Sequence, residues 1–158
     1  RYLYGINLGV DWKGIDFSIL LQGAARSSIY LQQDIAWDNF WGNYYEEHIG
    51  RWTPETAATA TYPRFTKAAT AAHPNYYKSD YWLKDSKYLR LKNIQLGYTI
   101  PRKLLKKFGV RSLRVYANAY NLFTWDNVKK VDPESSNNSN GQFYPQQKVI
   151  NFGINLNF

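Results

Sequence analysis

The chain has 158 residues, contains neither cysteine nor methionine, and carries a formal net charge of +8 at pH 7. Its length suits one ordinary domain, and the absence of cysteine excludes a disulfide scaffold and cysteine-based metal sites. Aromatic residues make up 18% of the chain, which exceeds the need of a small soluble core and is typical of interfacial girdles and contact surfaces. No apolar run reaches the roughly 18 residues that a membrane-spanning helix needs, but spanning strands that alternate apolar and polar residues remain possible.

The positive charge suggests an acidic partner such as nucleic acid. Most basic residues are dispersed along the chain, and no nucleic-acid recognition motif accompanies them. The one cluster comprises Arg102, Lys103, Lys106, Lys107 and Arg111. We expect these side chains to be solvated in a short turn, and we expect no nucleic-acid partner.

The first 25 residues predict a hairpin. In residues 2–11 an apolar or aromatic side chain occupies every second position, with glycine, asparagine or aspartate at most of the positions between. This two-residue period is that of a strand. The sequence from Asp11 to Gly14 predicts a tight turn, and residues 15–25 resume the alternation with only Leu20 as an apolar residue on the polar side.

Residues 27–85 lack any period, and we expect a long external loop there, to which we assign no regular structure apart from a candidate helical turn at Ala68 to Ala72. Alternation returns in residues 88–100 and 112–124, with a second polar loop at 126–145. Within the third strand, Leu89 and Leu91 have the opposite parity to Ile94 and Leu96. This predicts either a β-bulge near Lys92 and Asn93 or a strand that leaves the membrane and packs under loops.

The last strand, residues 147–158, has one wholly apolar face and one face of small or amide-bearing residues. An edge strand of a soluble β-sandwich would also alternate in this way. A final aromatic residue preceded by alternate apolar positions is, however, common in outer-membrane barrels, where the barrel assembly machinery reads it. The candidate assembly signal comprises Ile150, Phe152, Ile154, Leu156 and Phe158.

The predicted connections alternate in length: residues 11–14 and 101–111 are short, whereas residues 27–85 and 126–145 are long. Successive connections of antiparallel strands lie at opposite ends of a sheet, so the short ones share one end. Transmembrane barrels have short periplasmic turns and long external loops, which predicts that the C-terminus is periplasmic. Because five strands cannot close a barrel in lipid, we expect further strands upstream of Arg1 or from other copies.

Several stretches resemble the C-terminal part of the SusC/RagA-type TonB-dependent outer-membrane transporters. They keep their order and their spacing relative to the predicted strands: Arg51 to Glu55, Tyr62 to Arg64, Ser79 to Pro101, Leu113 to Tyr116, Asn121 to Trp125, Asp132 to Glu134, Tyr144 to Gln146 and Phe152 to Phe158.

The resemblance implies an all-β fold in which residues 1–158 form the last five antiparallel strands of a 22-stranded barrel in the outer membrane of a Gram-negative bacterium. It further implies import of large nutrients such as oligosaccharides or peptides beneath a SusD-like surface lipoprotein that acts as a lid. TonB would act through a plug region upstream of this chain. Two alternatives are a SusC-like barrel that serves as a structural or assembly-complex subunit, and a soluble β-sandwich binding module.

The chain offers no nucleophile motif, and we expect neither an enzyme nor a cofactor. Asp34, Asp38, Glu46 and Glu47 lack the ordered spacing of a calcium loop, so we expect no metal site. Trp and Tyr rings stack on sugars and on peptide side chains. The candidates for ligand or lid contact are Trp37, Trp41, Tyr44, Tyr45 and Trp52, although these rings would equally serve to pack the long loop on itself.

Overall fold

The computed structural model describes residues 1–67, 72–128, 130–134 and 144–158. Most of the helical turn expected at Ala68 to Ala72, and much of the second long loop, therefore lie outside the described residues. The chain forms two compact units: one comprises residues 1–27, 86–127 and 145–158, and the other comprises residues 28–85 and 128–144. Each unit is described by itself below. Among the described residues, no helix is both long and apolar enough to cross a membrane.

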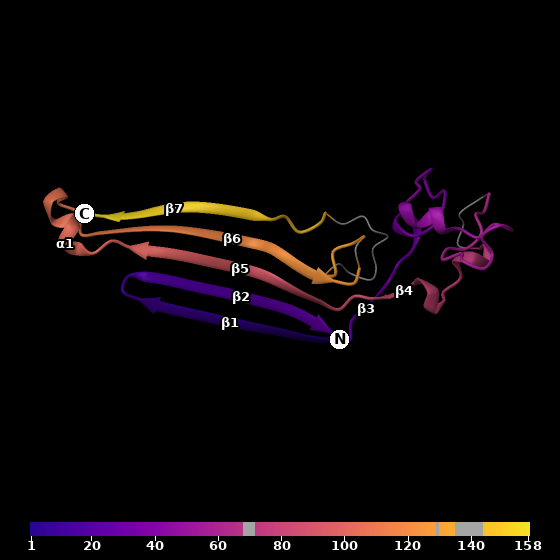
Figure 1. Cartoon of the computed structure of the whole chain (residues 1–158), viewed down its shortest axis with the longest axis horizontal. Helices are drawn as coiled ribbons and strands as arrows, with labels where there is room; N and C mark the ends of the chain where they lie inside the picture. Colours follow the sequence, from indigo (N-terminus) through magenta and orange to yellow (C-terminus); the bar gives the residue numbers. More distant parts are fainter. Residues whose placement is uncertain (68–71, 129, 135–143) are drawn as a thin grey trace. The chain divides into compact units, whose positions relative to one another are not determined.

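The first unit, called here the sheet unit, is a five-stranded antiparallel sheet with the strand order β1-β2-β5-β6-β7 (Figure 1). The strands are β1 (Tyr2–Trp12), β2 (Ile15–Ala25), β5 (Tyr88–Thr99), β6 (Ser112–Asp126) and β7 (Val149–Asn157). Each end lies within two residues of the range expected from the alternating pattern. The predicted all-β antiparallel fold is confirmed.

The register of the sheet places apolar residues in line across all of its strands. Val10 pairs with Phe17, Phe17 with Leu96, Leu96 with Ala117, and Ala117 with Phe152. Because alternate side chains of a strand point to opposite faces, one face of the sheet is apolar along its whole width. The apolar side chains on it are largely uncovered, with Phe152 83% exposed and Val10 61% exposed.

The next row of pairs carries only small and polar residues. Gly9 pairs with Ser18, Ser18 with Gln95, Gln95 with Asn118, and Asn118 with Asn151. The two faces therefore differ in polarity at every strand. A shift of one residue in any pairing would exchange the faces of that strand.

A β-bulge lies at Lys92, as one of the two alternatives predicted. Asn93 pairs with Leu20 and Leu91 pairs with Leu21, so Lys92 has no counterpart on β2. The extra residue returns Leu91 and Leu89 to the apolar face, since they lie opposite Leu21 and Gly23. β5 pairs with both of its neighbours as far as Tyr88, and the other alternative, that the upper part of this strand leaves the membrane and packs under loops, stays a prediction.

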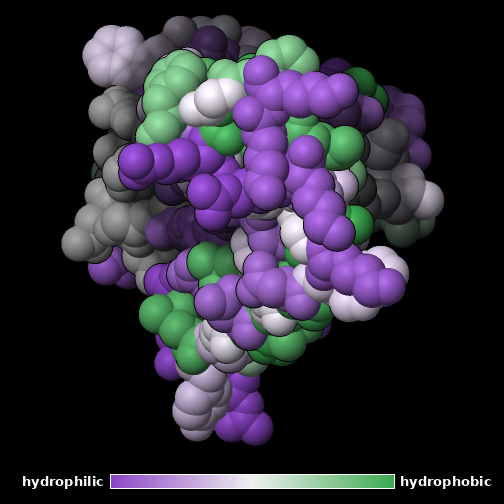
Figure 2. All heavy atoms as spheres, turned by 90° about the vertical axis from the view of Figure 1, so that its left-hand side faces the viewer, coloured by the Kyte–Doolittle hydropathy of each residue, from purple (hydrophilic) through white to green (hydrophobic). Residues whose placement is uncertain are grey.

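Two short connections lie at one end of the sheet. Lys13 and Gly14 join β1 to β2 with positive φ values of 48° and 87°, the left-handed geometry that a two-residue hairpin needs. The other connection contains α1 (Arg102–Leu105) and the 3₁₀ helix η5 (Lys106–Phe108). Figure 1 shows the C-terminus beside α1. Figure 2 views the molecule from the end of the sheet that carries the short connections, and hydrophilic residues are gathered at the front of this view.

The second unit, called here the loop unit, contains structure that the sequence did not predict. Its described residues form a two-stranded sheet of β3 (Ser28–Tyr30) and β4 (Leu83–Asp85) and four 3₁₀ helices. These are η1 (Gln33–Ile35), η2 (Glu46–Gly50), η3 (Pro74–Tyr76) and η4 (Asp80–Trp82). No sequence pattern indicates β3 and β4, because strands of three residues are too short to display a period.

Candidate functional site

An aromatic core holds the loop unit together. Trp37 is only 4% exposed, and its ring lies 4.6 Å from the ring of Tyr76 and edge-on to Phe40 at 5.7 Å. The other buried members of this core are Ile29, Leu31, Ile35, Ala36, Tyr62, Trp82 and Val128. Of the five aromatic residues predicted to contact a ligand or lid, Trp37 therefore packs the interior of the loop unit.

Asp38 is fully buried at the edge of this core. Its carboxylate accepts hydrogen bonds from the Tyr76 hydroxyl and from the backbone N–H of Thr66 at 2.9 Å. The Tyr62 hydroxyl lies 3.4 Å from the same carboxylate and makes its shorter hydrogen bond, of 2.8 Å, to the Ala36 carbonyl. Because a buried carboxylate is tolerated only when its oxygens are satisfied, these donors fix the position of Asp38. The carboxylate in turn ties together three segments that are distant in sequence.

The tyrosines of this network remain protonated donors. Burial, with the nearby Asp38 carboxylate, raises the pKa of Tyr62 and of Tyr76 well above the ordinary value. Burial likewise raises the pKa of Tyr81 to about 12. Since a phenolate is disfavoured at all three positions, their hydroxyls act as hydrogen-bond donors throughout the physiological pH range.

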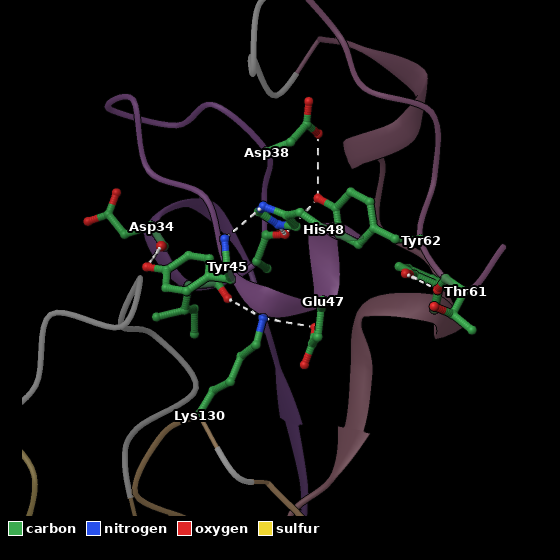
Figure 3. A network of polar contacts seen from close by, with 11 residues as sticks. Asp34, Asp38, Tyr45, Glu47, His48, Thr61, Tyr62 and Lys130 are labelled. Carbon is green, nitrogen blue, oxygen red and sulfur yellow. Dashed lines mark hydrogen bonds and ion pairs between the residues drawn. The ribbon is translucent and has the colours of Figure 1, made fainter. Parts of the chain in front are cut away.

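His48 is buried and neutral. Its ring lies 4.5 Å from the Tyr62 ring and also packs against Tyr44, Tyr45 and Phe65. The backbone N–H of Tyr45 donates to Nδ1 at 3.1 Å, which leaves Nε2 as the protonated nitrogen that donates to the Ala36 carbonyl at 3.3 Å (Figure 3). Burial lowers the pKa of His48. The imidazole therefore serves as a structural hydrogen-bond bridge.

Lys130 braces the same region from the second long loop. Its Nζ lies 2.8 Å from a carboxylate oxygen of Glu47, 3.4 Å from the Ile35 carbonyl and 4.8 Å from the centre of the Tyr45 ring. The Tyr45 hydroxyl donates to the Asp34 carbonyl, as Figure 3 shows. Tyr45, the second predicted contact residue, is half-buried and is held from both sides.

The acidic residues considered for a metal site are used otherwise or lie apart. Asp38 accepts from tyrosines and Glu47 pairs with Lys130, whereas Glu46 is exposed. Within the described ranges, no group of three His, Asp or Glu side chains is arranged to hold a metal ion.

Three of the predicted contact residues have accessible rings. Trp41 is 81% exposed, Tyr44 is 56% exposed and Trp52 is 38% exposed. Trp52 follows Arg51, and its backbone N–H donates to the Tyr62 carbonyl at 2.9 Å. The structure thus divides the five residues into two packed ones and three that can stack on another molecule, a division that carries no sequence signal because these rings follow no period.

A hollow of about 500 Å³ adjoins Trp52. Its lining consists of Trp52, Ala57, Ala60, Thr61, Tyr62, Pro63, Arg64 and Tyr81. Tyr81 and Arg64 therefore lie next to Trp52, a predicted contact residue, although neither of them was itself among the predicted contact residues. Both lie within stretches that resemble family motifs, and the interpretation from the sequence is that Arg64 braces the loop rather than contacts a solute.

The polar face of the sheet unit has its own ionic link. Arg114 on β6 reaches across β5 to Asp16 on β2, with Nε 2.8 Å from Oδ1. Gly97 lies beneath this pair, and a Cβ there would come within 2.6 Å of both side chains. The guanidinium of Arg114 also lies 4.8 Å from the centre of the Tyr116 ring. This face is therefore cross-linked by charge rather than by apolar packing.

The candidate assembly signal lies on and next to β7. Ile150, Phe152, Ile154 and Leu156 belong to the apolar face, and Phe158 follows the strand. All five side chains are exposed in the sheet unit. Their role in barrel assembly stays a prediction.

Comparison with known proteins identifies relatives over almost the whole chain, although no family model matches it. The chain is 28% identical to the TonB-dependent receptor P26 of Formosa agariphila, over 99% of this chain and 17% of the receptor. It is 26% identical to the TonB-dependent receptor SusC of Bacteroides thetaiotaomicron, over 99% of this chain and 15% of SusC. The chain therefore spans less than a fifth of these relatives.

The fold is also similar to part of a solved transporter. The structure of the RagAB peptide importer in its open-open state matches 99% of this chain and 17% of the importer chain, with a TM-score of 0.77 and 25% sequence identity. The resemblance to SusC/RagA-type TonB-dependent receptors is confirmed, and the five strands correspond to a segment of such a barrel.

Proposed function

We propose that this chain contributes the last strands and two external loops of an outer-membrane importer that takes up large nutrients, either oligosaccharides or peptides, in a TonB-dependent manner. A plug region upstream of the chain would contact TonB, and a SusD-like lipoprotein would close over the external loops. The relatives named TonB-dependent receptor, SusC and RagAB importer support this proposal.

The observation that carries the proposal is the unbroken apolar row across the sheet. Soluble proteins rarely leave a large continuous apolar surface uncovered, yet this face is exposed at β1, β2, β5 and β7. In a barrel, lipid would cover the apolar face, and the face with the Asp16–Arg114 pair would line the interior. The strand register aligns apolar residues on one face and polar residues on the other, as the strands of a transmembrane barrel do.

The loop unit supports a role in capture. Its core of Trp37, Tyr62 and Tyr76 gives the long loop a defined shape, and Trp41, Tyr44 and Trp52 keep accessible rings. We propose that these three rings contact the solute or the lid lipoprotein, while Trp37 and Tyr45 hold the loop that presents them.

Uptake by cells tests the proposed function. A strain that lacks the full-length protein should lose uptake of a fluorescent oligosaccharide or peptide pool, and a plasmid copy should restore it. Uptake should also stop when the cytoplasmic membrane is de-energised, because TonB transmits that energy. If the deletion strain takes up both pools normally, and the outer-membrane assembly complexes of that strain dissociate, the structural-subunit alternative is favoured.

Sidedness provides a separate test. A cysteine in place of the exposed Ala58, in the loop unit, should react with a membrane-impermeant maleimide on intact cells. A cysteine in place of the exposed Lys107, in the connection between β5 and β6, should react only after the outer membrane is permeabilised. The reverse pattern would contradict the proposed periplasmic position of the C-terminus.

A further inference from the structure

The hollow beside Trp52 has a lining that, among the described residues, is mostly apolar and contains one cationic side chain, that of Arg64. We propose that it binds the C-terminal residue of a peptide, with an apolar side chain against Trp52 and Tyr81 and the terminal carboxylate at Arg64. The inference rests on the proposed import function, because the ligand must reach the external loops from outside the cell.

The lining of the hollow is mostly apolar and aromatic. Ala57, Ala60 and Pro63 contribute aliphatic surface, and Trp52 and Tyr81 contribute rings. At about 500 Å³ the hollow is large enough for one bulky side chain and its flanking backbone. Burial of an apolar side chain there removes it from water, which favours binding.

Few polar groups of the hollow remain available to a ligand. The Tyr81 hydroxyl already donates to the Thr61 carbonyl at 2.8 Å. The Thr61 hydroxyl oxygen faces Gly50, where it would lie 2.3 Å from an added Cβ. A sugar ring with several hydroxyl groups needs several well-placed donors and acceptors. The described lining offers such side-chain groups at Arg64 and Thr61, since the Tyr62 and Tyr81 hydroxyls already donate to backbone carbonyls.

Arg64 supplies the one strong donor. Its side chain is exposed, and no hydrogen bond or ion pair of its guanidinium joins it to another described residue. Arg64 also lines a neighbouring hollow, and none of the described residues that line either hollow is acidic. A guanidinium next to an apolar slot matches a carboxylate that is attached to an apolar residue.

Binding to the purified full-length protein in detergent tests the proposal. The probe is fluorescein-labelled Gly-Gly-Gly-Leu-Phe, with either a free carboxylate or a terminal amide, and fluorescence anisotropy measures the affinity. We expect the carboxylate form to bind about tenfold more tightly, the size expected for a charge-assisted hydrogen bond. Arg64→Gln should abolish this preference, and Arg64→Lys should retain part of it.

Matched variants separate recognition from folding. Trp52→Ala should weaken both probes, whereas Trp52→Phe should keep most of the affinity, and Arg102→Gln in the short connection should leave both affinities unchanged. Heat-modifiable migration confirms that each barrel is folded. Equal binding of the carboxylate and amide by the unsubstituted protein overturns the proposal without any variant.

Two further outcomes also decide the matter. Carboxylate preference that survives Arg64→Gln removes Arg64 from the site. Displacement of the peptide by maltohexaose in a manner that depends on Trp52 reassigns the hollow to sugars. Neither result contradicts the proposed import function. That proposal is contradicted only if the deletion strain takes up both fluorescent pools normally.

Discussion

The sheet unit exposes many of its aromatic and aliphatic side chains, whereas the loop unit buries many of them in a core. Phe152 in the sheet unit is 83% exposed, whereas Trp37 in the loop unit is 4% exposed and surrounded by other rings. Asp38, a charged residue, is fully buried in the loop unit. In the sheet unit, by contrast, Asp16 and Arg114 meet on the open polar face.

This difference is the one that the proposed function predicts for a chain that meets two solvents. The loop unit buries apolar side chains in a core, as a domain that is surrounded by water does. The sheet unit pairs the backbones of neighbouring strands and leaves the apolar side chains of one face exposed, which fits the lipid-facing segment of the proposed barrel. Four changes test this contrast between a buried apolar core and an exposed apolar face, and they follow in order of decreasing effect.

The largest effect is expected from loss of the Trp37 ring. Trp37→Ala should destabilise the loop unit by about 3 to 5 kcal/mol, because a cavity would open in the aromatic core. Limited proteolysis of the full-length protein should then cleave within residues 28–85. The matched variant Trp41→Ala removes an exposed ring and should leave the cleavage rate nearly unchanged. Equal cleavage of the two variants would show that the loop has no cooperative core.

The next effect concerns the outward face of the sheet. Phe152→Arg should cost about 2 to 4 kcal/mol if Phe152 lies near the middle of the bilayer, and the yield of heat-modifiable barrel in outer membranes should fall. Asn151→Arg places the same charge on the opposite face of β7, opposite Asn118, and should be tolerated. Similar yields for both variants would be incompatible with a lipid-facing apolar surface.

A smaller effect is expected at the crossing of Arg114 over β5. Gly97→Ala should destabilise the barrel by about 1 to 3 kcal/mol, since the added methyl group would displace the Asp16–Arg114 pair. Gly9→Ala is the control, because a Cβ there has 3.8 Å to its nearest neighbour. Urea unfolding of the purified protein measures both variants. A wild-type midpoint for Gly97→Ala would mean that the ion pair is not held across Gly97.

The smallest effect is the pH dependence conferred by His48. Its pKa is lowered in the folded loop unit, so the unfolded state binds more protons once the pH falls below about 6.5. Stability should be complete above that pH and decline as the pH falls towards the folded pKa, because a protonated Nδ1 would face the Tyr45 N–H. Amide-exchange protection at residues 45–48, compared at pH 7.5 and 5.0, measures this decline.

His48→Gln is the control for that measurement. A glutamine amide can still accept from the Tyr45 N–H but cannot take up a proton, so protection should change less with pH. An unchanged decline in His48→Gln would assign the pH dependence to another group. Charged groups that face His48 are Asp38, Glu47 and Lys130, and they define the alternatives.

The sequence by itself determined most of the sheet unit. A two-residue period is preserved in the sequence because one face of the sheet is apolar along its whole width, so the strand ranges and the hairpin at Lys13 and Gly14 were predictable. The bulge at Lys92 was one of two alternatives that the sequence left open. The motif from Ser79 to Pro101 likewise carried the resemblance that the comparisons confirm.

Only the tertiary structure decided the loop unit. Trp37 and Trp41 are four positions apart in a stretch without a period, and nothing local distinguishes the buried ring from the exposed one. Whether each ring is buried depends on its contacts with core residues such as Tyr62, Tyr76 and Val128, which lie far from both rings in the sequence. The same is true of the hollow, where Arg64 and Tyr81 meet Trp52 only after folding. Contacts between residues far apart in sequence leave no periodic trace, and so the site required the structure.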